Sequence, residues 1–206
     1  MLLHIHPESP QSRLIAQVVS IFQKEGVVVY PTDSSYAIGC MLGNQKGMDR
    51  ILKIRQDSPK DHYFSLICQD LSSLSHYALV DNPQYRLLKA ILPGAYTLIL
   101  KGTREVPKKL LMPKRNTVGL RVPNHVIIQA VLAELGAPIL STTLKVPGYE
   151  AYELNDASII DDVIGNHVDA IIDGGACSME PTTVIDLSNG APEILRKGQG
   201  STTLFE

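Results

Sequence analysis

A short apolar run near the middle of the chain carries polar side chains that could bind an anion. If Thr117-Val118-Gly119-Leu120-Arg121-Val122 forms a strand, successive side chains point to opposite faces. The two valines and the leucine would then enter the core, whereas Thr117, Gly119 and Arg121 would share the other face. An arginine fork binds carboxylate or phosphate, a threonine hydroxyl donates or accepts, and glycine leaves space for a ligand. A surface strand with a bulge at the glycine is the alternative.

Two further pairs of polar residues could serve the same kind of ligand. Ser141 and Thr143 share one face at the end of an expected strand, where mixed sheets commonly bind ligands, although such hydroxyls can also satisfy a turn. Lys53 and Arg55 close an expected helix, and two cations there could embrace a polyphosphate. Interaction of each cation with the helix dipole, worth ~0.3–1 kcal/mol, is a sufficient structural alternative.

Several familiar catalytic and cofactor motifs are absent from the sequence. It contains neither a G-x-x-x-x-G-K loop nor a G-x-G-x-x-G turn, so a nucleotide would have to be bound by another scheme. The histidines form no H-x-x-x-H or His/Cys cluster, which argues against zinc, and no G-x-S-x-G elbow is present. We expect the three cysteines to be small buried apolar residues: Cys40, Cys68 and Cys177.

The apolar periodicity indicates the elements that must position these residues. Apolar residues recur with helical spacing after Ser9-Pro10 and stop at Gly26, which predicts a first helix. A buried strand over 27–30 and a polar loop over 32–36 follow. Further helices are expected at 44–54, 71–77, 83–92, 124–135 and 157–164, and strands at 64–68, 96–100, 117–122, 139–143, 170–173, 183–187 and 193–196.

Helices and strands alternate only partly, and the last strands follow one another closely. This order predicts an α+β (mixed α/β) protein with helices packed on a mixed sheet. A length of 206 residues suits one domain over residues 1–206, and 44% apolar with 19% charged residues excludes disordered, collagen-like and coiled-coil chains. With no long apolar span and no signal-peptide start, the sequence predicts a cytoplasmic protein with no membrane partner.

The net charge of −2 hides an uneven distribution along the chain. Residues 101–121 contain seven basic residues and one acid, whereas residues 150–193 contain ten acids and no lysine or arginine. A basic segment in an otherwise acidic chain suggests an anionic partner, either a nucleotide or a nucleic acid. A solvated loop of lysines and arginines is the simpler alternative.

Six short motifs follow one another in a characteristic order. They are Pro31-Thr32-Asp33, Lys53-x-Arg55, Leu92-Pro93-Gly94-x-x-Thr97, Thr117-Val118-Gly119-Leu120-Arg121-Val122-Pro123, Pro181-Thr182-Thr183-Val184-x-Asp186 and Ile194-Leu195-Arg196-x-Gly198. Together they resemble the YrdC/YciO-like domain family, over about residues 10–200. Details such as Tyr36-Ala37-Ile38-Gly39-Cys40 make the chain most similar to the YciO branch.

The resemblance implies both a fold and a chemistry. The family fold, also described as RibB-like, is a single twisted, open mixed sheet flanked by helices, with a concave basic face. The best-known members are threonylcarbamoyl-AMP synthases, which convert L-threonine, bicarbonate and ATP, bound as its Mg²⁺ complex, to threonylcarbamoyl-adenylate and pyrophosphate. Because this step begins the t6A modification of tRNA, the resemblance also implies tRNA and other tRNA-modification proteins as partners.

Roles for ten residues follow from the resemblance. Lys53 and Arg55 would be catalytic, because they would offset charge that develops on the departing pyrophosphate. The threonine substrate would be held by Thr32, Thr117, Arg121 and Thr182, and ATP by Arg55, His62, Ser141, Thr143 and Arg196. No residue is expected to bind a metal directly.

The sequence departs from the synthases within the expected nucleotide pocket. Ser141-Thr142-Thr143 stands where synthases have Ser-x-Asn, and a longer, more acidic connection over 56–62 replaces the proline that follows their K-x-R. Three hypotheses therefore stay open. The first is a nucleotidyltransferase of the synthase type, and the second is a protein that binds double-stranded RNA or tRNA on the same concave face without catalysis. The third is a related ligase or hydrolase that uses another carbamoyl or acyl-adenylate substrate.

Overall fold

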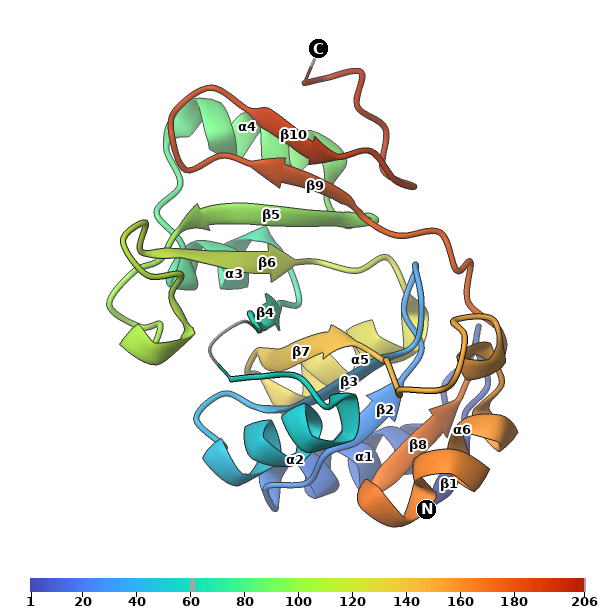
Figure 1. Ribbon diagram of the computed structural model, residues 1–206. Coiled ribbons are helices and arrows are strands. Elements are labelled where there is room, and N and C mark those ends of the chain that lie inside the picture. The colour runs from blue at the N-terminus through green and yellow to red at the C-terminus, as the bar shows by residue number, and fades with distance from the viewer. Residues whose placement is uncertain (60–61, 206) are drawn as a thin grey trace.

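The computed structural model describes residues 1–59 and 62–205, and in them it shows one ten-stranded mixed sheet with helices on both faces (Figure 1). The strands are β1 (Leu2–His4), β2 (Val28–Tyr30), β3 (Ala37–Met41), β4 (Ser65–Ile67), β5 (Tyr96–Lys101), β6 (Thr117–Arg121), β7 (Ile139–Thr143), β8 (Ala170–Asp173), β9 (Thr183–Asp186) and β10 (Glu193–Arg196). Their order across the sheet is β1-β8-β2-β3-β7-β4-β6-β5-β9-β10. Parallel and antiparallel pairs both occur, so the expected mixed sheet is confirmed.

Helices cover the two faces of the sheet unequally. The helices are α1 (Ser12–Gln23), α2 (Gln45–Arg55), α3 (Leu71–Tyr77), α4 (Asn82–Ile91), α5 (Val126–Leu135) and α6 (Ala157–Ile164). On one face α2, α3, α4 and α6 bury apolar side chains in a core that extends along the whole sheet. On the other face α1 and α5 pack together, and their apolar cluster reaches Ile139 and Ile67 but includes no described residue of β5, β6 or β9.

Small side chains lie at the centre of the less covered face. The strand register aligns Ser141 of β7 with Ser65 of β4, and Ser65 with Gly119 of β6. A Cβ atom at Gly119 would lie 2.8 Å from Ser65 Oγ, so a larger residue there would displace the Ser65 hydroxyl. Because serine and glycine fill little volume, the sheet face is hollow here, between bulkier rows of side chains.

Most elements lie where the periodicity predicts them. The helices at 71–77 and 157–164 and the strands at 139–143, 170–173 and 193–196 are confirmed at both ends. Two short strands, β1 and β3, were not predicted. The predicted start of the first helix at Ser9-Pro10 is wrong, because the Ser9 N–H donates to His6 Nδ1 at 3.0 Å in a turn, and α1 begins at Ser12.

The expectation for the cysteines is confirmed at two of three positions. Cys40 and Cys68 are buried, and burial raises the pKa of each thiol to about 12, so both stay neutral. Cys177 is only half-buried. Among the helices in the described part of the chain, none has the length and apolar character needed to cross a membrane.

Candidate functional site

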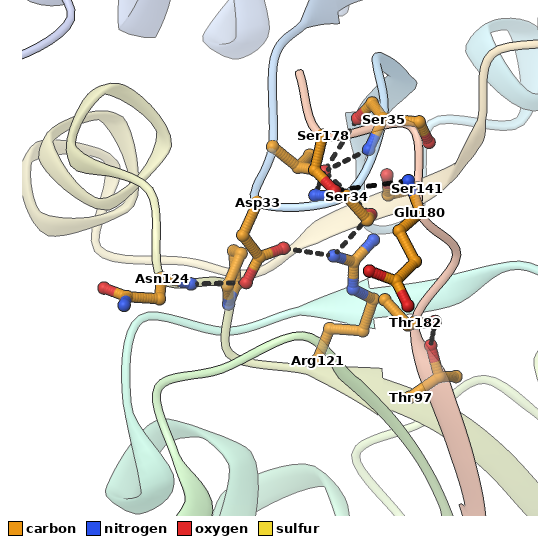
Figure 2. Close-up of polar contacts among 12 residues, drawn as sticks. Asp33, Ser34, Ser35, Thr97, Arg121, Asn124, Ser141, Ser178, Glu180 and Thr182 are labelled. Carbon is orange, nitrogen blue, oxygen red and sulfur yellow. Dashed lines mark hydrogen bonds and ion pairs between the residues drawn. The ribbon is translucent and has the colours of Figure 1, made fainter. Parts of the chain in front are cut away.

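A cavity of about 330 Å³ lies over the hollow centre of the sheet. Strand residues form its floor, the loop after β2 contributes Ser34 and Ser35, and the segment before β9 contributes Met179 and Pro181. Figure 2 shows that this segment passes close to the loop, with Ser178 and Glu180 near Ser34. Hydroxyl groups and two guanidinium groups supply most of its polar character. The lining residues are Ser34, Ser35, Ser65, Ile67, Thr97, Arg121, Ser141, Thr142, Thr143, Ala151, Met179, Pro181, Thr182 and Arg196.

Arg121 ends β6 and is almost completely buried at one wall of the cavity. Its Nη2 donates to Asp33 Oδ1 at 2.7 Å and to Ser34 Oγ at 3.2 Å, and Asp33 Oδ2 accepts the Asn124 N–H at 2.7 Å (Figure 2). Burial lowers the pKa of Arg121, while the neighbouring Asp33 carboxylate opposes that shift, so the guanidinium stays charged. Within the described residues its buried Nε has no hydrogen-bond partner. The Nε–H group of Arg121 is therefore a donor that no described residue accepts, in a guanidinium that borders the cavity.

Thr32 organises the loop that closes one side of the cavity. Its Oγ1 accepts the Ser34 N–H at 3.1 Å and donates to the Ser35 carbonyl at 2.7 Å, which are the contacts of a tight hydroxyl-stabilised turn. This turn presents Ser34 and Ser35 to the cavity. Thr32 itself is buried and does not line the cavity, so the structure places its hydroxyl inside the loop.

A network of hydrogen bonds centred on Thr182 forms another part of the cavity wall. Thr182 Oγ1 and Thr97 Oγ1 lie 2.7 Å apart, and Arg196 donates from Nε and Nη2 to the Thr182 carbonyl at 3.0 and 2.8 Å. Arg196 Nη2 also reaches Thr182 Oγ1 at 3.1 Å. All three side chains line the cavity, so the structure brings Thr182 and Arg196 together with Arg121, as the sequence motifs predict.

Ser141 and Thr143 form the β7 end of the cavity, and Arg55 contacts Thr143 without lining the cavity itself. In this contact Arg55 Nη1 donates to the Thr143 carbonyl. Gln56, with a φ of 55°, ends α2 and turns Asp57 back, so that Asp57 Oδ2 lies 2.6 Å from Arg55 Nε and 3.0 Å from His62 Nδ1. Residues 60 and 61 of the connection over 56–62 lie outside the described residues.

The charges of this small network support one another. Burial opposes ionisation of Asp57, but the hydrogen bond and positive charge of Arg55 hold the pKa of its carboxyl below the ordinary value. Burial and Arg55 lower the pKa of His62, against the attraction of Asp57, so a neutral imidazole is favoured near neutral pH. In the described part of the protein, the buried His62 Nε2 has no partner.

Five of the ten predicted site residues do not line this cavity: Thr32, Lys53, Arg55, His62 and Thr117. His62 lines a different cavity, beside Phe64 and Lys109. Lys53 is exposed and lines a separate cleft of about 410 Å³ beside Arg50 and His167, because helix residues two positions apart point to different sides. Thr117 lies at the far end of β6 from Arg121, where it is fully buried and pairs with Met112 outside the cavity. The sequence predicts that Lys53 and Arg55 act on one ligand, and that Thr117 and Arg121 do so too. The structure does not bring the members of either pair to one cavity.

Sequence reasoning missed several residues of the site. Ser34, Ser35 and Ser65 line the cavity, and Asp33 holds Arg121. Asp33 was part of the Pro31-Thr32-Asp33 motif, so its acidic side chain near an expected anion site was an available signal. Ser65 was marked only by period-two alternation on a three-residue strand, which is too short to distinguish a functional face from a solvent face.

Comparison with known proteins gives a consistent relationship. A family model described as telomere recombination and named for Sua5, YciO and YrdC matches residues 20–198. The chain is 52% identical to the uncharacterized protein YciO of Escherichia coli over 202 residues, which cover 98% of this chain and 97% of that one. It is 30% identical to the threonylcarbamoyl-AMP synthase of Pseudoalteromonas translucida over 189 residues, or 88% and 97% of the two chains.

Solved structures confirm the fold. The crystal structure of E. coli YciO superposes with a TM-score of 0.91 at 49% identity and covers 100% of this chain and 99% of its own. The structure of Pyrococcus abyssi (P. abyssi) Sua5 complexed with L-threonine superposes with a TM-score of 0.84 at 22% identity, over 96% of this chain and 57% of its own. The open mixed sheet flanked by helices is thus shared with E. coli YciO and with the matched part of P. abyssi Sua5.

Proposed function

The chain belongs to the family of Sua5, YciO and YrdC, and from this premise we propose that it is a threonylcarbamoyl-AMP synthase. In the proposed reaction L-threonine, bicarbonate and ATP give threonylcarbamoyl-adenylate and pyrophosphate, for the t6A modification of tRNA. The relative with this printed activity shares 30% identity with the chain over 97% of its own length. The YciO proteins, at 52% identity, have no stated activity.

One observation carries the proposal: a buried guanidinium with an unfilled donor stands beside a cavity ringed by hydroxyl groups. Arg121 keeps Nε unpaired within the described residues, although burial of an unsatisfied charged donor costs free energy. A carboxylate of an amino acid would pair with this guanidinium from the cavity, and the Thr97 and Thr182 hydroxyls line the same cavity for its other polar atoms. P. abyssi Sua5 binds L-threonine, and we propose the same ligand here.

The nucleotide would lie toward the β7 end of the cavity. Ser141 and Thr143 offer hydroxyl donors there, and Arg55, which donates to the Thr143 carbonyl, adds a positive charge beside them. Arg196 is bonded to Thr182 on the β9 side of the cavity, so it would meet the nucleotide from that side. Mg²⁺ would enter with ATP and be held by its phosphate oxygens, which is how this ion usually binds with nucleotides.

In the proposed reaction the protein positions the substrates and stabilises developing charge, and no protein nucleophile is needed. Arg121 would orient the amino acid through its carboxylate, and the hydroxyl groups would fix the nucleotide. Arg55 would offset negative charge that develops on the departing pyrophosphate. The network with Asp57 and Thr143 holds Arg55 in one place, so little reorganisation is needed when the charge forms.

A direct product assay tests this proposal. Purified protein with Mg-ATP, L-threonine and ¹³C-bicarbonate is expected to form threonylcarbamoyl-adenylate that carries the label, detected by mass spectrometry. Omission of any one substrate should remove the product. A folded protein that binds Mg-ATP and L-threonine yet forms no labelled adenylate would contradict the synthase proposal.

RNA binding is a second candidate, favoured by the basic segment. Lys101, Arg104, Lys108, Lys109, Lys114 and Arg115 are all exposed. Since such contacts are made to phosphates, the logarithm of the affinity for duplex RNA should fall with the logarithm of salt, by about 0.9 per contact by analogy with duplex DNA.

Fluorescence anisotropy with labelled tRNA and duplex RNA measures this effect. Lys108→Gln with Lys109→Gln is expected to reduce the salt slope by roughly two if both lysines touch phosphates. The matched control is Arg13→Gln with Lys24→Gln, which removes two exposed charges at α1. Equal slopes in the two double variants, or no binding at low salt, would reject this candidate.

A further inference from the structure

A buried hydroxyl pair joins the core of the sheet to the cavity. Tyr30, the last residue of β2, is fully buried, and its hydroxyl lies 2.5 Å from Oγ of Ser141, which lines the cavity. β3 runs between the two strands, and Gly39 on β3 is the cross-strand partner of Ser141. A Cβ atom at Gly39 would lie 3.0 Å from the Tyr30 hydroxyl, so the glycine makes room for this contact.

The direction of the hydrogen bond follows from what surrounds it. Burial raises the pKa of Tyr30 above its ordinary value, so its phenol keeps the proton. A buried phenol proton needs an acceptor, and within residues 1–59 and 62–205 the acceptor for Tyr30 is Ser141 Oγ. Since a serine hydroxyl has one proton, and no second partner for Ser141 is found among the same residues, that proton is left to point into the cavity.

We propose that Tyr30 is a positioning residue, which makes the Ser141 hydroxyl a fixed donor toward the cavity. The ligand atom at Ser141 is then an acceptor, an unprotonated oxygen of an anion, and an N–H or O–H group of the ligand is disfavoured there. This inference rests on the proposed function for the identity of the anion. A phosphate oxygen of ATP and the carboxylate of L-threonine share the required chemistry.

Binding of each ligand by calorimetry distinguishes the two sources. Ser141→Ala should lower the affinity for the ligand that contacts Ser141 by roughly 10–100-fold, because a hydrogen bond to a charged group is lost. Tyr30→Phe should lower the affinity for the same ligand by roughly 3–10-fold, because the Ser141 hydroxyl must then be ordered during binding. The double variant should bind no more weakly than Ser141→Ala, since Tyr30 acts only through Ser141.

The matched control for loss of a buried phenol is Tyr96→Phe. Tyr96 is buried, donates to the Ser201 carbonyl at 3.0 Å, and does not line the cavity, so the affinity for both ligands should stay within about twofold. Unchanged affinity of Tyr30→Phe for both Mg-ATP and L-threonine would overturn the proposal. So would a double variant that is clearly weaker than Ser141→Ala.

A second measurement requires no substrate. In a Cys177→Ser background, the Ser141→Cys variant would place a thiol where it accepts the hydrogen bond from the Tyr30 hydroxyl. This hydrogen bond stabilises the thiolate and so lowers the pKa of the thiol. Adding Tyr30→Phe should raise the midpoint pH of its alkylation by iodoacetamide by roughly one unit. An unchanged midpoint overturns the role of Tyr30. If the wild-type protein binds neither ligand, the proposed function fails, while this midpoint shift still decides the inference about Tyr30.

Discussion

Arg121→Ala is expected to remove L-threonine binding, with an affinity loss of roughly 100-fold or more. The guanidinium is buried, its Nε is unpaired in the described part of the structure, and it borders the cavity. Loss of a desolvated charge that pairs with a ligand carboxylate costs far more than loss of a surface charge, since water does not replace it. Calorimetry with L-threonine measures the affinity, and thermal unfolding shows whether the variant is folded.

A second variant is needed because Arg121 also stabilises the fold. Its removal leaves the buried Asp33 carboxylate with the Asn124 N–H but without its cation, and breaking such a buried pair typically costs about 3–5 kcal/mol. Arg121→Lys keeps a cation for Asp33 but lacks the planar fork of donors. We therefore expect Arg121→Lys to fold and to bind L-threonine at least roughly tenfold more weakly than the wild type.

The carboxylate itself can be tested by a change in the ligand. L-Threonine amide lacks the negative charge, so the wild-type protein should prefer L-threonine strongly over the amide. If Arg121 recognises the carboxylate, Arg121→Lys should narrow that preference, whereas a variant with only a distorted cavity should weaken both ligands alike. An undiminished preference in a folded Arg121→Lys protein would place the carboxylate elsewhere.

The fold was largely predictable because local patterns and tertiary packing agree in most elements. In β6 the alternation predicted that Val118, Leu120 and Val122 would be buried, and all three are. The pattern failed where the signal was short or tertiary: β1 has three residues, and β3 is buried on both faces, so neither shows a clear alternation. β1 pairs with β8 and β3 pairs with β7, and these backbone hydrogen bonds stabilise strands that the local sequence does not indicate.

The site was harder to predict because it depends on register and on helix geometry. Ser65 meets Ser141 only through the pairing of β4 with β7, which links residues far apart in the sequence. Lys53 and Arg55 form a pair in the sequence, yet their positions on α2 separate them: Lys53 lines another cleft, whereas Arg55 binds the Thr143 carbonyl. Motif order thus identified Arg121, Thr182 and Arg196 together, while the floor of the cavity emerged only from the three-dimensional arrangement.

Arg55→Ala is expected to reduce formation of threonylcarbamoyl-adenylate by roughly 100-fold or more, mainly through kcat. Arg55 is fixed by Asp57 and by the carbonyl of Thr143, a residue that lines the cavity, so its charge is already in place when pyrophosphate begins to leave. An interaction that strengthens only in the transition state lowers the barrier without tightening substrate binding. Steady-state kinetics at varied ATP should therefore show a larger change in kcat than in KM.

Arg50→Ala is the matched control for this variant. Arg50 lies on the same helix, is partly exposed, and pairs with Asp169 at 2.7 Å beside a separate cleft, so its loss removes an equal charge and an arginine–aspartate pair that is more exposed than that of Arg55. Its kcat should stay within about threefold of the wild type, because an exposed pair contributes only about 0–1 kcal/mol. If both variants lose activity equally, Arg55 acts through the stability of α2. If Arg55→Ala stays active, the charge that assists pyrophosphate must come from another group, and Lys53→Ala would then test the cation two residues away.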